Sequence, residues 1–214
     1  MLVDELTLPD AVREHLLVIQ KNATIEARLI ENLLDVTKAE KGRLQLSLRP
    51  ADVHDVLRAV IEVCGPDLEN KHIGLSVELE AMDHRLEADS DRLQQVFWNL
   101  LKNAVQYTEN TGQLVIRSMN SLNDLLRVEI ADSGRGISLE LTARIFEPFE
   151  QGKESEGLEL GLAISKAIVE LHGGVIKATS EGIGRGSTFV VELALGQRFA
   201  LLNPSLLENR QIER

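Results

Sequence analysis

Apolar residues recur at steps of three and four between about residues 10 and 41, which predicts one long amphipathic helix. Asp10 is suited to cap its first turn. An apolar stripe of this length needs a second helix to cover it, so we expect a helical hairpin or a dimeric bundle. The stripe consists of Val12, Leu16, Ile19, Ala23, Ala27, Ile30 and Leu34.

The spacing changes after Gly42, where leucines alternate with polar residues and predict a half-buried strand. Further along, helical and strand patterns are mixed, which favours an α+β fold in which a helical layer covers one mixed sheet. This change of pattern divides the chain into a partial hairpin over 1–42, a compact domain over 43–196 and a tail over 197–214. Helices are expected from about 52 and at about 90–108, 139–146 and 160–172, and strands at about 75–80, 85–88, 114–119, 126–131, 175–180 and 187–195.

The formal charge of −11 argues against an electrostatic hold on nucleic acid or anionic lipid. No stretch approaches the roughly 18 apolar residues of a membrane helix, and the first residues lack the basic region of a signal peptide. We therefore expect a cytoplasmic protein whose segment here contacts neither membrane nor nucleic acid. Cys64 is the only cysteine, which excludes an internal disulfide, and its place on an apolar helix face predicts a core position.

Two glycines follow a carboxylate at the end of an apolar strand in the segment Asp132 to Ile137. Glycine accepts a positive φ and leaves room for a backbone to approach a planar ligand, while aspartate accepts a hydrogen bond from an amine such as that of adenine. A plain turn after the strand is the alternative explanation of so short a pattern. The candidate contacts are Asp132, Gly134, Gly136 and Ile137.

Asn99 and Asn103 are four residues apart in the helix expected over 90–108, so their amides share one face. An amide oxygen is a neutral, hard ligand, suited to a Mg²⁺ ion whose charge phosphates already balance. Two exposed helix asparagines are the simpler alternative.

Five segments, taken in order, resemble the N, G1, F, G2 and G3 boxes of the sensor histidine kinases. The resemblance runs from about residue 10 to 195 and implies a Bergerat-type ATP-binding fold with ATP and Mg²⁺ as cofactors. It makes Asn103 the metal ligand and Asn99 part of the phosphate site. An amide at Asn99, where hydrolytic relatives usually carry Glu, argues against a simple ATPase because an amide is no general base. The segments are 99–108, 132–137, 146–149, 157–162 and 184–189.

The same resemblance implies further ATP contacts, among them a stack of Tyr107 beside the base and a phosphate site at the helix that follows Gly161. The chain departs from the family at Gln106, which replaces a Lys, and at Glu159, which replaces the second glycine of the G2 box. Both changes should weaken phosphate binding, since one removes a positive charge and the other adds a negative one. The lid over 151–157 is also short. The further ATP contacts are Gln106, Tyr107, Gly157, Leu160, Gly161, Leu162 and Thr188.

No histidine matches the phosphoacceptor pattern of the family. His15 follows Glu14 in reversed order, and the resemblance places it on the second helix of the hairpin. We therefore expect the phosphoacceptor on a helix that this chain lacks, so that its catalytic residue is unknown.

Three functions remain open. The resemblance implies the catalytic portion of a two-component sensor histidine kinase, which transfers the γ-phosphoryl group of Mg-ATP to that absent His. Its implied partners are a second copy, bound through the N-terminal helix, and the receiver domain of a response regulator. A degenerate module for nucleotide binding or dimerisation is favoured by Gln106, Glu159 and the short lid. A Ser-directed kinase of the same superfamily is the third, and the long helix before residue 42 weighs against it.

Overall fold

The computed structural model divides the chain into two units, Met1–Leu44 and Gln45–Arg214. In the first unit, residues 33–39 are helical, within the helix that the apolar stripe predicts. Ala23 and Ala27 of the stripe, the cap Asp10 and the tail over 197–214 lie outside the described residues. The structure describes residues 12, 15, 16, 19, 30, 33–39, 41–121, 124–148 and 160–195.

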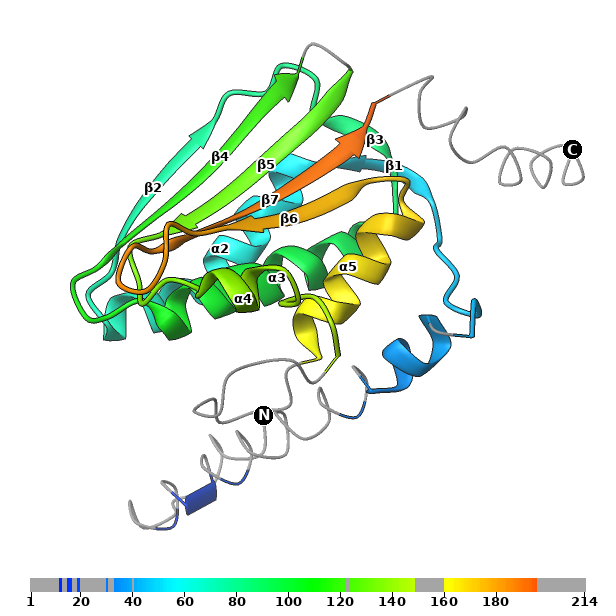
Figure 1. Cartoon of the computed structure of the whole chain (residues 1–214). Coiled ribbons are helices and arrows are strands. Elements are labelled where there is room, and N and C mark those ends of the chain that lie inside the picture. The colour runs from blue at the N-terminus through cyan, green and yellow to red at the C-terminus, as the bar shows by residue number, and fades with distance from the viewer. Residues whose placement is uncertain are drawn as a thin grey trace, which may run out of the picture. The chain divides into compact units, whose positions relative to one another are not determined.

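The second unit is built on a five-stranded sheet with the order β2-β4-β5-β7-β6 (Figure 1). β2 pairs parallel with β4, and the other neighbours are antiparallel, which confirms the mixed sheet. β1 and β3 form a separate antiparallel pair. The strands are β1 Arg49–Asp52, β2 Gly74–Leu79, β3 Arg85–Ala88, β4 Gln113–Ser121, β5 Leu125–Asp132, β6 Val175–Thr179 and β7 Ser187–Ala194.

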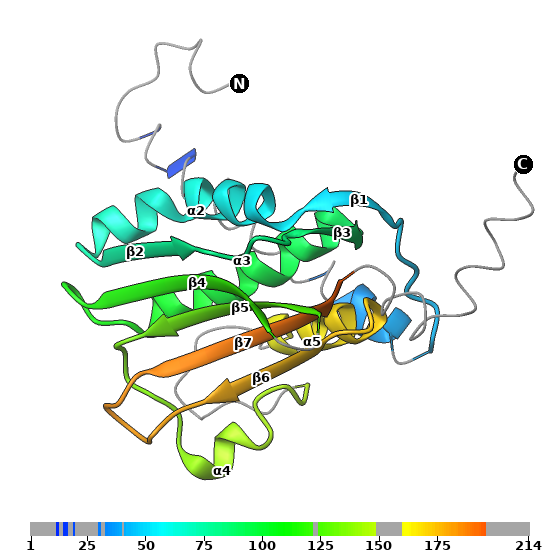
Figure 2. The same cartoon turned by 90° about the horizontal axis from the view of Figure 1, so that it is seen from above.

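Helices cover one face of this sheet (Figure 2). Each of the two long helices begins at an aspartate: Asp52 accepts from the amides of the first turn of α2, and Asp89 does so for α3. α4 ends at Thr142, four residues before the expected end of the helix, and the chain continues in turns. The helices are α2 Val53–Asn70, α3 Ser90–Tyr107, α4 Leu139–Thr142 and α5 Gly161–Leu171.

The core lies between the helices and the sheet. The alternation in β5 buries Leu126, Val128 and Ile130 against α3, as the sequence pattern predicts, and Cys64 is buried in α2. The remaining fully buried side chains come mainly from α3, β4 and α5. They include Leu93, Phe97, Leu100, Leu101, Leu114, Ile116, Leu160, Leu162 and Ile164.

The opposite face of the sheet carries charged side chains that pair across neighbouring strands. Such cross-strand pairs of opposite charge stabilise a solvated sheet face and disfavour like-charge neighbours. The cross-strand pairs are Glu78 with Arg117 (2.6 Å), Arg127 with Glu192 (3.3 Å) and Lys177 with Glu192 (3.6 Å). Arg127 also pairs with Glu129 (2.7 Å), two residues further along the same strand.

Asp89 holds three segments together. Its carboxylate accepts from the amide of Arg92 in α3 at 3.2 Å and from the amide of Ser47 at 2.8 Å. Its own N–H donates to Nε2 of the fully buried His172 at 3.0 Å, at the end of α5. The start of α3 and the end of α5 are therefore fixed to each other, and these helices carry the walls of the pocket described next.

Candidate functional site

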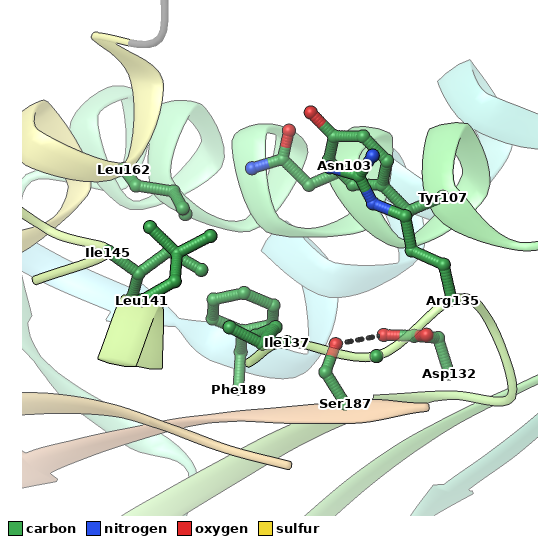
Figure 3. Close-up of a pocket in the computed structure, with 11 residues that line it drawn as sticks. Asn103, Tyr107, Asp132, Arg135, Ile137, Leu141, Ile145, Leu162, Ser187 and Phe189 are labelled. Atoms are coloured by element: carbon green, nitrogen blue, oxygen red, sulfur yellow. Dashed lines mark hydrogen bonds between the residues drawn. The ribbon is translucent and has the colours of Figure 1, made fainter. Parts of the chain in front are cut away.

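A pocket opens between α3, α4, α5 and the end of the sheet (Figure 3). Its wall combines a polar side, from α3 and the end of β5, with an apolar side from α4, α5 and β7. Most of its residues come from the G1 segment and from α3, although other elements contribute. The lining residues are Asn103, Tyr107, Asp132, Arg135, Gly136, Ile137, Leu141, Ile145, Leu162, Ser187 and Phe189.

Asp132 ends β5 and points into the pocket. One carboxylate oxygen accepts from the N–H of Gly134 at 2.8 Å, and the other accepts from the hydroxyl of Ser187. Ser187 starts β7 directly opposite Asp132 in the register of the two strands. These two bonds orient the carboxylate and leave it further acceptor sites, since an ionised carboxylate has about four.

The glycines of the G1 and G3 segments let two loops of the protein pack together. A Cβ atom at Gly136 would overlap the carbonyl oxygen of Gly182, and one at Gly186 would overlap that of Asp132. Gly136 and Gly186 also have positive φ values of 70° and 68°. A side chain at Gly134 would strike the carbonyl of Tyr107. The sequence explained the G1 glycines by close approach to a ligand, whereas the structure shows close approach of backbone to backbone.

Asn103 and Tyr107 project from neighbouring turns of α3 into the pocket, as their spacing predicts (Figure 3). Gln106 is exposed and does not line it. Its carbonyl oxygen instead accepts from the ammonium of Lys71 at 2.9 Å, which also binds the carbonyls of Val105 and Thr108. Lys71 thus caps the end of α3, a role that no local sequence signal announces.

Asn99 is buried and does not line the pocket. Its amide nitrogen donates to the carbonyl of Gly161 at 3.0 Å and to the hydroxyl of Ser165 at 3.3 Å. Its side chain turns toward the first turn of α5, and its place in the phosphate site stays a prediction. Of the G2 segment, Leu162 lines the pocket, Leu160 is fully buried and Gly161 begins α5. Gly157 and Glu159 lie outside the described residues.

Thr188 was the predicted contact from the G3 segment, and the structure places its two neighbours in the pocket instead. Side chains alternate along a strand, so Ser187 and Phe189 share one face of β7 while Thr188 belongs to the other. Phe189 also packs edge to face on Phe146, with ring centres 6.3 Å apart. Phe146 of the F segment therefore anchors its loop to a residue of the pocket.

Arg135 is the cationic member of the lining, and no pattern in the sequence predicted it. Its guanidinium carbon lies 3.9 Å from the centre of the Tyr107 ring. Its N–H donates to the carbonyl of Tyr107 at 3.0 Å, and its carbonyl accepts from Gly184 at 2.6 Å. The loop between β5 and α4 is thus joined by its backbone to both α3 and the loop before β7.

The described ranges contain no group of three or more His, Cys, Asp or Glu side chains that could hold a metal ion. Asn103 fits a different kind of metal site, in which one amide oxygen supplements ligands that a phosphate chain provides. Within the same ranges, no helix is both long enough and apolar enough to cross a bilayer.

The sequence matches one family model over residues 88–197, about half of the chain. That model is described as the histidine kinase-, DNA gyrase B-, and HSP90-like ATPase. The match includes α3, β4 to β7 and α5, and with them the lining of the pocket.

Similar curated proteins include two that are named as sensor proteins. The sensor protein DivL of Caulobacter vibrioides is 33% identical over 194 residues, which cover 91% of this chain and 25% of that protein. The aerobic respiration control sensor protein ArcB of Escherichia coli is 32% identical over 189 residues, which cover 84% of this chain and 24% of that protein. The chain therefore spans about a quarter of the length of these relatives.

Similar solved structures include full-length ShkA in complex with AMPPNP, with a TM-score of 0.76 at 27% identity. That match covers 91% of this chain and 42% of ShkA. The nucleotide-free catalytic domain of the histidine kinase ThkA has a TM-score of 0.63 at 30% identity, and covers 69% of this chain and 95% of that domain. Both matches agree with a mixed sheet covered by helices.

Proposed function

From the membership of this chain in the histidine kinase-, DNA gyrase B-, and HSP90-like ATPase family, we propose that its pocket binds Mg-ATP and presents the γ-phosphoryl group to a histidine of another helix. The chain corresponds to the ATP-binding catalytic portion of a sensor histidine kinase. The transfer itself, the acceptor histidine and the protein partners are properties of the whole protein, and they are proposed here.

One observation carries the proposal: the carboxylate of Asp132 is fixed at the end of a narrow pocket by Gly134 and Ser187. A carboxylate held in this way accepts from the exocyclic amine of adenine, and it disfavours guanine, whose carbonyl oxygen occupies the corresponding ring position. The ring itself requires apolar walls. Ile137, Leu141, Ile145, Leu162 and Phe189 provide them.

In the proposed complex, the phosphates of ATP lie near the start of α5 and the exposed side of α3. The amides at the start of an α-helix, together with its dipole, favour anionic oxygens, and α5 begins at Gly161. Asn99 fixes this helix start through its bond to Gly161. Asn103 would hold Mg²⁺ through its amide oxygen, and the ion would balance the charge of the phosphates.

These residues act by binding and positioning. The nucleophile is the neutral imidazole nitrogen of the acceptor histidine, which forms a bond to the γ-phosphorus while the bond to the leaving ADP oxygen breaks. This reaction needs no general base on the nucleotide-binding chain. The absence of a carboxylate at Asn99 is consistent with it, since a Glu there would activate water instead.

The proposed partners follow from the relatives. ThkA has been solved in complex with the response regulator protein TrrA, in a structure with 25% identity and a TM-score of 0.66 to this chain. We propose a receiver domain of a response regulator as the partner of the whole protein, and a second copy as the partner of its apolar stripe. A cytoplasmic location is part of the same proposal.

A binding-only module is the second candidate, and Gln106 favours it. A neutral, exposed amide stands where the family usually carries a lysine, so the phosphates lose a charge-assisted contact. Such a module would still bind the adenine through Asp132. The two candidates therefore differ in phosphoryl transfer and agree in adenine recognition.

The test combines ATP binding with transfer. The full chain is mixed with γ-labelled ATP, Mg²⁺ and a separately supplied kinase hairpin that carries a phosphoacceptor His, and label on the hairpin is followed in time. We expect transfer that is lost when the His of the hairpin is replaced by Ala. ATP binding without transfer to any hairpin favours the binding-only module, and a folded chain that binds no adenine nucleotide contradicts both candidates.

A further inference from the structure

The base side of the pocket is narrow in this structure. The cavity between the lining residues measures about 40 Å³. A single water needs roughly 10–15 Å³ by the same measure, so the cavity holds a few waters and is too small for a purine. A base can enter only after a side chain of the lining has moved.

Arg135 is the side chain that covers the aromatic wall. Its guanidinium lies on the face of the Tyr107 ring, 3.9 Å from its centre, and both residues line the cavity (Figure 3). A planar cation on an aromatic face occupies the area that a planar base would use. Arg135 and a stacked base are thus alternatives on the same side of Tyr107.

The backbone under this stack is held by hydrogen bonds, whereas the Arg135 residue is exposed to solvent. The N–H and carbonyl of Arg135 are bonded to Tyr107 and Gly184, and Gly134 packs against the carbonyl of Tyr107. A movement of the whole loop would break these bonds and contacts. Rotation of the Arg135 side chain leaves these backbone bonds intact and breaks the stack on Tyr107, an interaction of modest strength at a partly exposed site.

We propose that Arg135 gates the base site: its guanidinium stacks on Tyr107 in the free protein and leaves that ring face when adenine enters. The inference rests on the proposed function, because it takes adenine as the ligand of this pocket. A closed population lowers the apparent affinity by the fraction that is open. Removal of the guanidinium should therefore strengthen binding of the base, which is the opposite of what loss of an ordinary ligand contact does.

The stack can be observed without any activity. Tyr107 is the only tyrosine of the chain, and protons over the face of its ring are shifted upfield in an NMR spectrum. We expect upfield δ protons for Arg135 in the free protein, and a return to ordinary positions at saturating adenosine. Arg185, an exposed residue of the neighbouring loop that does not line the pocket, should stay at ordinary positions throughout. Ordinary shifts of Arg135 in the free protein, or upfield shifts that persist with adenosine bound, overturn the gate.

Affinity supplies the second test. Calorimetry with adenosine compares Arg135→Ala with Arg185→Ala, which removes the same charge from the adjacent loop. We expect Arg135→Ala to bind adenosine about two- to fivefold more tightly than the unmodified chain, as the strength of such a stack implies, and Arg185→Ala to bind it unchanged. Equal or weaker binding by a folded Arg135→Ala variant contradicts the gate alone. Failure of every one of these proteins to bind adenosine contradicts the proposed function, and the gate with it.

Discussion

The amide nitrogen of Asn99 donates to the carbonyl oxygen of Gly161 at 3.0 Å, which joins the middle of α3 to the first residue of α5. The hydroxyl of Ser165 donates to the same carbonyl at 2.7 Å. Asn99 is thus a buried structural link at the start of α5, whereas Asn103, one turn further along α3, belongs to the pocket. The two asparagines of the N box should respond differently to the same substitution.

We expect Asn99→Ala to lower the free energy of unfolding by about 1–3 kcal/mol, because it removes buried hydrogen bonds and leaves unfilled space. Asn103→Ala serves as its matched control on the same helix and should change stability by less than about 0.5 kcal/mol. Urea unfolding measures both, and calorimetry with Mg-ATP should show the reverse order of effects on affinity at temperatures where both variants are folded. Equal destabilisation by the two substitutions would contradict the assignment.

Ser187 and Thr188 form a second contrasting pair. Ser187→Ala removes the hydroxyl that orients the Asp132 carboxylate, so adenosine should bind about fivefold more weakly, which is about 1 kcal/mol. Thr188→Ala alters the opposite face of β7 and should leave that affinity unchanged. Titration of both variants with adenosine measures the two effects, and a larger loss from Thr188→Ala would support the Thr188 contact that the sequence predicts.

His172 should make the domain sensitive to acid. Burial lowers the pKa of His172, while its bond to the carbonyl of Ile168 opposes this shift. Its neutral form also accepts from the N–H of Asp89, and a proton on that nitrogen would face another donor. The unfolded chain therefore binds this proton more readily than the folded one, so stability is present above the unfolded pKa of about 6.5 and falls as the pH drops toward the folded pKa.

Urea unfolding at several pH values between about 7.5 and 5 measures this loss. His172→Gln should show a smaller fall in stability over that range than the unmodified chain. His54, whose pKa is also lowered by burial, is the same in both proteins and does not enter the difference. Identical pH dependence of the two proteins would show that His172 contributes nothing.

The apolar stripe of the first unit is exposed at several described positions of the single chain. Ile19 is 63% exposed, Ile30 60% and Leu34 52%. Because an uncovered apolar face of this kind favours self-association, we expect a dimer in light scattering, and a monomer after Ile19→Glu and Ile30→Glu are combined. Leu139 is an exposed residue of the other unit, so Leu139→Glu is the control and should leave the dimer intact. A monomeric unmodified chain at high concentration, with its helix formed, would contradict the prediction.

The elements that the sequence predicts well are those with a clear period. The alternation that ends at Asp132 gives both the strand β5 and its buried face, and the spacing of Asn103 and Tyr107 places both on one side of α3. The contact of Gly134 and Gly136 with a ligand stays a prediction. Their need for space is visible in the sequence, but what fills the space depends on where distant loops lie.

The features that the sequence does not predict depend on contacts between residues far apart in the chain. Ser187 meets Asp132 only because β7 pairs with β5, and no local pattern sets that register. The helical period of α3 shows on which face of the helix Asn99 lies, but it does not show that α5 packs against that face. The same holds for Lys71, whose ammonium reaches the carbonyls at the end of α3 from the turn that follows α2.

Adenine recognition by Asp132 is tested most directly by calorimetric titration of Mg-ATP into the unmodified chain and into Asp132→Asn. The substitution places an amide donor opposite the adenine amine, so we predict a loss of about 1–3 kcal/mol in binding free energy. Purine riboside, which lacks that amine, should bind both proteins with nearly equal affinity. Equal affinity of the two folded proteins for Mg-ATP would contradict the account.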